Sequence, residues 1–216
     1  MTHSSSSSEP ASAADFSREL AALATERERF LREGTLADVF AVAYFHLTKR
    51  ISELPLRYPE VTAAQIRGFY AAYTQRESLP HWRPYLELAG TRRLKRSTDP
   101  GALLQALLER AMIPHILYDL PPALCAARPE MLSWEALAPD FFALDPLFDR
   151  VAHTTLLDFD HATRRLGALR STHREALELG SWLLARFGGG TVRVRRLRRQ
   201  AWNAARHGHN LPKNAV

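Results

Sequence analysis

Residues 99–121 read DPGALLQALLERAMIPHILYDLP and form the most strongly patterned stretch of the chain. Asp99 is a favourable N-cap, and Pro100 suits the first position of a helix, where no backbone donor is needed. The apolar residues that follow recur at helical spacing. Pro114 removes a backbone donor inside this pattern, so we expect the helix to kink or end nearby. We expect the Leu-Pro-Pro run that begins at Leu120 to stop it.

A histidine and an aspartate follow this proline. If the helix resumes, His115 and Asp119 lie four residues apart on one face. An imidazole and a carboxylate in that arrangement can act as an acid/base pair or as two metal ligands. Tyr118 is a further candidate donor, on a different part of the helical wheel. The simpler interpretation is a buried histidine whose hydrogen bond to its neighbour only satisfies both groups.

The remaining apolar patterns are helical too. They predict an all-α fold, a single-domain bundle of about seven to eight helices with the Pro-kinked helix at its centre. Residues 15–33 form an amphipathic pattern that ends at Gly34, a typical helix stop. Thr35 and Asp38 predict one capping box, and Thr62 and Gln65 predict another.

A second acid–histidine pair has the same spacing. Asp149 and His153 fall in a helix that we expect to begin with Asp145 as its cap. Two antiparallel helices could bring His115, Asp119, Asp149 and His153 together, as helix bundles do when they build metal sites. A divalent metal is therefore a candidate cofactor. Nine histidines and 23 acidic residues also produce such pairs by chance.

The basic charge of the chain is concentrated at one end. The net charge is +6, and residues 186–216 hold eight of the 29 basic residues and no acidic one. The rest of the chain is close to neutral. The last helix, expected over 191–207, could contact nucleic-acid phosphates, adhere to an acidic surface or membrane headgroups, or turn arginines inward to pair with core acids. The candidate partner-binding residues are Arg195, Arg196, Arg198, Arg199 and Trp202.

Composition excludes several classes. The single cysteine, Cys125, rules out an intrachain disulfide framework and is compatible with a reducing, cytoplasmic location. No apolar run approaches the length of a membrane span. Residues 1–14 are Ser/Ala-rich, and we expect a disordered arm rather than a secretory signal. We place the helical domain at 15–209 and a tail at 210–216. The Walker A, GxGxxG, HExxH, GxSxG and CxxC motifs are absent.

The run AMIPHILYDLPPAL at 111–124 resembles the hallmark G-M-N-A-H-I-x-x-D-L-P-x-A-L of a family of uncharacterised, largely actinobacterial helical proteins. The segments FYAAYTQRE, PHWRPYLELA and RRQAWNAAR resemble other parts of that family in the same order, so the likeness spans roughly 35–207. His115, Asp119, Leu120 and Pro121 match the hallmark. The family's asparagine two positions before the histidine is replaced by Ile113. The resemblance implies the helical fold and marks His115 as a candidate functional residue, but it does not imply a reaction.

Two functional hypotheses follow. The first is a small enzyme or ligand-binding protein that uses a polar site around His115, with Asp119 orienting the imidazole. Aromatic helices would shape an apolar pocket for a small metabolite. The alternative is a non-catalytic protein that binds an acidic partner or nucleic acid through the basic last helix. The first hypothesis requires His115 at the wall of a cavity that solvent can reach.

Overall fold

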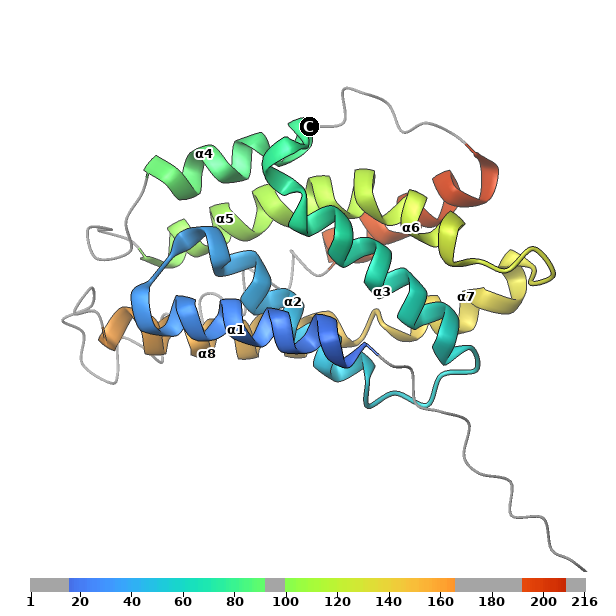
Figure 1. The fold of residues 1–216 in the computed structure, drawn as a ribbon, viewed down its shortest axis with the longest axis horizontal. Helices are drawn as coiled ribbons and strands as arrows, with labels where there is room; N and C mark the ends of the chain where they lie inside the picture. The colour runs from blue at the N-terminus through green and yellow to red at the C-terminus, as the bar shows by residue number, and fades with distance from the viewer. Residues whose placement is uncertain (1–15, 92–99, 166–191, 209–216) are drawn as a thin grey trace, which may run out of the picture.

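The computed structural model describes residues 16–91, 100–165 and 192–208, and every regular element in them is a helix, which confirms the predicted all-α bundle (Figure 1). The chain forms α1 (Ser17–Glu33), α2 (Val39–Ile51), α3 (Pro59–Thr74), α4 (Arg83–Thr91), α5 (Pro100–Pro114), α6 (Leu120–Ala127), α7 (Trp134–Ala143) and α8 (Leu147–Arg165). Residues 192–207 form a further helix, called the C-terminal helix below. Short 3₁₀ turns occur at η1 (Leu36–Asp38), η2 (Arg76–Ser78) and η3 (Pro80–Trp82). The expected arm at 1–14 and tail at 210–216 lie outside the described residues.

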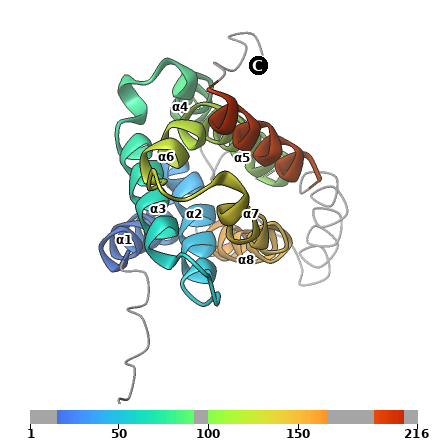
Figure 2. The same ribbon diagram turned by 90° about the vertical axis from the view of Figure 1, so that its right-hand side faces the viewer.

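The helices pack in two neighbouring groups. On one side α1 packs against α2 and α8, and on the other α3 packs against α6. Figure 2 shows the C-terminal helix near α6 and α7. Its apolar residues belong to one cluster with residues of α6 and α7. None of the helices in the described part is both long and apolar enough to cross a lipid bilayer.

The central helix changes its winding after Pro114, near the position where the sequence predicts a kink or an end. After Pro114 the residues His115–Asp119 form one π-helical turn, η5, in which the Leu120 N–H bonds to the His115 carbonyl five residues back. The expected stop at Leu120 is wrong, because α6 begins there and continues to Ala127. Pro121 falls in the first turn of α6, where a backbone donor is not required. Such π turns inside α-helices occur frequently at functional sites.

The helix boundaries test three predictions from the sequence, of which one is correct and two are wrong. The stop after α1 is confirmed, because Gly34 adopts a φ of 69° and its N–H bonds to the Phe30 carbonyl at 2.8 Å. Both capping boxes are wrong. Thr35 makes no side-chain cap bond before η1. The helix that should begin at Thr62 begins at Pro59 instead, so Thr62 lies inside α3.

Three buried apolar clusters make up the core, and a cavity lies where they meet. Its wall includes Phe40 from the first cluster, Ile116 from the second and Ile66 from the third. Side chains from three separately packed groups leave space at the seam between them. The π turn with His115 lies on this seam.

Candidate functional site

The Asp119 carboxylate is the centre of a buried hydrogen-bond group. His115 Nδ1 lies 2.5 Å from Asp119 Oδ2, so the contact predicted from their spacing is present. The Trp82 indole Nε1 donates to the same oxygen at 3.0 Å. His81 Nε2 lies 2.7 Å from the other oxygen, Oδ1. One carboxylate therefore orients two imidazoles and an indole.

The two additional partners come from η3, far from the π turn in sequence. Pro80 opens this 3₁₀ turn, which places His81 and Trp82 next to each other ahead of α4. The Trp82 ring is fully buried, whereas His81 keeps a partly exposed edge. Tyr118 stacks on the His81 ring at 5.1 Å between ring centroids. Tyr118 does not line the cavity, and its role as a candidate donor stays a prediction.

Aromatic rings enclose the His115 imidazole. Phe69 stacks on its face with ring centroids 3.3 Å apart, and Phe40 meets it edge-on at 4.8 Å. Gly68 lets α3 approach α6 closely, because a Cβ there would lie 3.3 Å from the Ala123 Cβ. That approach brings the neighbouring Phe69 onto His115. Only 1% of His115 is exposed.

The hydrogen bond to Asp119 fixes the tautomer of His115, and burial fixes its charge. A carboxylate only accepts, so Nδ1 carries the proton that it donates to Asp119. Burial lowers the pKa of His115 from 6.5 to about 4, although the hydrogen bond and charge of Asp119 oppose this shift. The imidazole is therefore neutral at pH 7, with a lone pair on Nε2. This buried Nε2 has no hydrogen-bond partner among the described residues.

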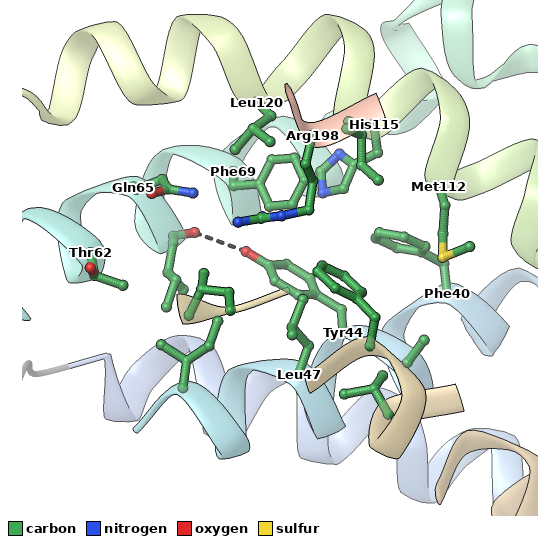
Figure 3. A pocket seen from close by; sticks show the side chains of 17 residues that line it. Phe40, Tyr44, Leu47, Thr62, Gln65, Phe69, Met112, His115, Leu120 and Arg198 are labelled. Carbon is green, nitrogen blue, oxygen red and sulfur yellow. Dashed lines mark hydrogen bonds between the residues drawn. The ribbon is translucent and has the colours of Figure 1, made fainter. Parts of the chain in front are cut away.

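His115 stands at the wall of a cavity of about 70 Å³ that is partly open to solvent. Most of the wall is apolar or aromatic. The Tyr44 hydroxyl also borders it and donates to the Ile66 carbonyl at 3.0 Å, as the dashed line in Figure 3 shows. Thr62 and Gln65, expected as helix caps, line the cavity instead. This arrangement is typical of small-molecule sites, which combine apolar walls with a few polar groups.

A buried arginine completes the polar part of the wall. Arg198 extends from the C-terminal helix toward the cavity, above Tyr44 in Figure 3, and is 4% exposed. Its Nε donates to Asp145 Oδ1 at 2.9 Å and its Nη2 to the Phe141 carbonyl at 2.5 Å. Burial lowers the pKa of Arg198, and Asp145 opposes that shift. The inward orientation that we considered for some of the arginines is the one that Arg198 adopts.

The other candidates of the C-terminal helix divide between core and surface. Trp202 is buried against Phe141. Neither Arg198 nor Trp202 is therefore exposed to a partner. Arg196 and Arg199 are exposed, and Arg195 is partly exposed.

Of the residues considered as metal ligands, those whose side chains are described do not all come together. His153 is exposed on α8, whereas His115 and Asp119 are buried beside the cavity. The side chain of Asp149 lies outside the described part of the structure. Among the residues that are described, no three or more His, Cys, Asp or Glu side chains are grouped so that they could hold a metal ion.

Sequence reasoning missed His81, Trp82 and Phe69, and it did not identify Arg198 as the arginine that turns inward. One signal for Arg198 was present, because it falls on the same helical face as Val194, Ala201 and Ala205, all of which are buried. His81 and Trp82 lay in a segment that resembled the actinobacterial family, but no spacing rule joined them to Asp119. Only the folded chain brings together residues 37 and 38 positions apart.

Comparisons with protein-family models, with curated proteins and with solved structures find no match to this chain.

Proposed function

We propose that this protein binds a small, largely apolar ligand in the cavity, and that His115 Nε2 accepts a hydrogen bond from a donor group on that ligand. The observation that carries the proposal is the unpartnered Nε2 of a neutral, buried imidazole at the cavity wall. A buried acceptor without a partner costs about 1–3 kcal/mol. A ligand hydroxyl or N–H would remove that cost, while the aromatic walls would take up its apolar body.

The low basicity of His115 favours binding over acid/base chemistry. General bases work best when their pKa lies near the operating pH. A pKa of about 4 keeps the imidazole neutral, so that Nε2 can accept a hydrogen bond, but it makes His115 a weak base at pH 7. Catalysis by His115, with Asp119 as its orienting group, requires a ligand whose own charge raises the imidazole pKa. An enzymatic role thus depends on the ligand.

We extend the proposal to the actinobacterial family that the sequence resembles. The matching His115 and Asp119 are the two residues at the centre of the hydrogen-bond group. Ile113, where the chain departs from the family's asparagine, is partly exposed and does not line the cavity. The substitution therefore leaves the proposed site intact.

The chain offers a direct reporter for the cavity. It has three methionines, of which Met112 lines the cavity and Met131 is 91% exposed elsewhere. Protein labelled with ¹³C at the methionine methyl groups gives at most three signals, and Met112→Leu assigns the one of interest. Titration with phenol and with anisole then compares two ligands of similar shape, of which only phenol donates a hydrogen bond.

We expect phenol to shift the Met112 signal without shifting the Met131 signal, and to bind several-fold tighter than anisole. His115→Phe removes the acceptor but keeps an aromatic ring, and should abolish the preference for phenol. His161→Phe, a change at an exposed position of α8, should leave it unaltered. Equal affinities for phenol and anisole in the wild type would contradict the role of Nε2. No response at Met112 to either compound would contradict the cavity as a binding site.

A second candidate function rests on the outer face of the C-terminal helix. Arg193, Arg196 and Arg199 are exposed at three-residue spacing and pair with no described carboxylate. This face suits the backbone of a nucleic acid or another acidic partner. Binding to a 20-base-pair duplex that weakens with salt and is lost in Arg196→Ser/Arg199→Ser would support it. Salt-independent binding, or no binding at low salt, would count against it.

A further inference from the structure

The cavity wall carries one cation and no acidic residue. Of the 17 residues that line it, only Arg198 is permanently charged, and none is Asp or Glu. The two nearby carboxylates stand behind the wall, with Asp145 on Arg198 and Asp119 on His115. A ligand in the cavity therefore meets a guanidinium and a neutral imidazole. This field disfavours a cationic ligand, although aromatic walls alone would accept one.

Arg198 also has unused donors. Its guanidinium has five N–H groups, of which Nε–H is bonded to Asp145 and one at Nη2 to the Phe141 carbonyl. Nη1 makes no hydrogen bond to any described residue. The guanidinium carbon lies 4.0 Å from the Phe141 ring centroid and 5.2 Å from that of Phe148, so the group is held in place by rings. Figure 3 shows it reaching toward Gln65, whose amide also has no partner among the described residues.

We infer that the ligand is a small monocarboxylate, whose carboxylate binds the free edge of Arg198 and whose compact, largely apolar body carries the hydroxyl or N–H group that donates to His115 Nε2. This inference rests on the proposed small-molecule function. A planar guanidinium with one edge occupied and one edge open matches a carboxylate, which it can hold through two parallel hydrogen bonds. A buried guanidinium with an unpaired edge is costly, and an anion offsets that cost better than a neutral carbonyl does.

Charge and size limit the class further. Arg198 is already partly balanced by Asp145, so it suits one added negative charge rather than the two of a phosphate ester. An engineered apolar cavity of about 150 Å³ binds benzene. The cavity here is about half as large but partly open, so its ligand body ranges from a branched short chain to one ring that extends into the mouth.

Matched acids and amides test the inference on the unmodified protein. Isobutyrate against isobutyramide and benzoate against benzamide differ in charge but little in shape. Titrations followed by the Met112 methyl signal should show the acids binding at least tenfold tighter than the amides. Equal affinity for acids and amides, or a preference for benzylamine, would overturn the carboxylate inference while leaving the phenol result and the proposed function in place. If no probe shifts the Met112 methyl signal, both the carboxylate inference and the proposed function are overturned.

Variants assign the effect to one arginine. Arg198→Met should remove the preference for acids, and Arg198→Lys should keep part of it because the charge remains without the planar fork. Arg206→Met removes the same charge from an exposed position on the same helix, and should leave the preference unchanged. If Arg198→Met does not fold, the Arg198→Lys result and the wild-type pairs decide the question. A preference for acids that is as strong in Arg198→Lys as in the wild type would assign the anion to another group.

Discussion

Two histidine–aspartate contacts in this protein have similar lengths and opposite surroundings. His115 Nδ1 lies 2.5 Å from Asp119 at the cavity wall, and His46 Nε2 lies 2.7 Å from Asp158 nearer the surface. The first pair is almost fully buried, whereas the side chains of the second are 13–15% exposed. The distances alone do not tell the two apart.

The difference lies in the other partners. Asp158 also binds Arg27 through both of its oxygens, so one carboxylate links α1, α2 and α8. Burial alone would raise the pKa of Asp158, but hydrogen bonds from His46 and Arg27 bring it below its usual value. This cluster joins helices and borders no cavity that we describe. At His115, by contrast, a polar atom is left over and a cavity is beside it. An unused polar atom on a residue that lines a cavity, and not the contact itself, marks a candidate site.

The largest expected effect is the loss of folding stability when Asp119 is removed, which we compare with the removal of Asp158. Asp119→Ala leaves His115 Nδ1–H and the Trp82 indole N–H buried without an acceptor. We expect a loss of about 2–6 kcal/mol in the free energy of unfolding, since each of these two buried donors costs about 1–3 kcal/mol when it is left without an acceptor. Urea unfolding at pH 7 measures it. A loss below about 1 kcal/mol would mean that Asp119 does not hold the group together.

The pH dependence of stability gives the next effect. The pKa of His115 is about 4 in the folded chain and 6.5 in the unfolded chain, so only the unfolded state takes up this proton between those values. The free energy of unfolding therefore falls as the pH drops from 6.5 to 4, by about 3 kcal/mol for this group. Its contribution is constant above pH 6.5. Urea titrations across this range should show a smaller fall in His115→Phe than in the wild type.

Asp158, the second carboxylate, supplies the control for this pH dependence. Its removal should have the smallest effect on stability. Asp158→Ala should cost only about 1–2 kcal/mol, because the released Arg27 and His46 side chains are partly exposed and can be hydrated. The lowered pKa of Asp158 means that its stabilising contribution is lost only as the pH falls below about 3.8. Above pH 5 the variant should run parallel to the wild type. A greater cost than that of Asp119→Ala would reverse the comparison.

Local sequence signals predicted part of this structure. Helical periodicity and Gly34 located α1 and its end, and the spacing of His115 and Asp119 predicted their contact. Leu120 and Pro121 led to a wrong prediction of a helix end. The chain stays helical through the π turn after Pro114 and through the Leu-Pro-Pro run, which ordinarily ends a helix. Both capping-box predictions are wrong. Thr35 and the Thr62/Gln65 pair match the local sequence pattern, but neither forms the cap in the folded chain.

The rest of the site depends on distant parts of the chain. His81 and Trp82 reach Asp119 only because η3 folds against the π turn. The cavity exists because three clusters meet at Phe40, Ile66 and Ile116, a property of packing that no local pattern records. Arg198 is the intermediate case, since its place on an apolar helix face was visible but its Asp145 partner was not.

The central claim is that His115 is neutral at pH 7, with its proton on Nδ1 and its Nε2 free to accept. The most direct test is ¹⁵N NMR of the His115 ring in the intact protein between pH 4 and 8, assigned with His115→Phe. We expect a protonated Nδ1 and an unprotonated Nε2 at pH 7, a midpoint for the second protonation near pH 4, and a shift of the Nε2 signal alone when phenol is added. A proton on Nε2 at pH 7, or a midpoint at or above 6.5, would contradict the account.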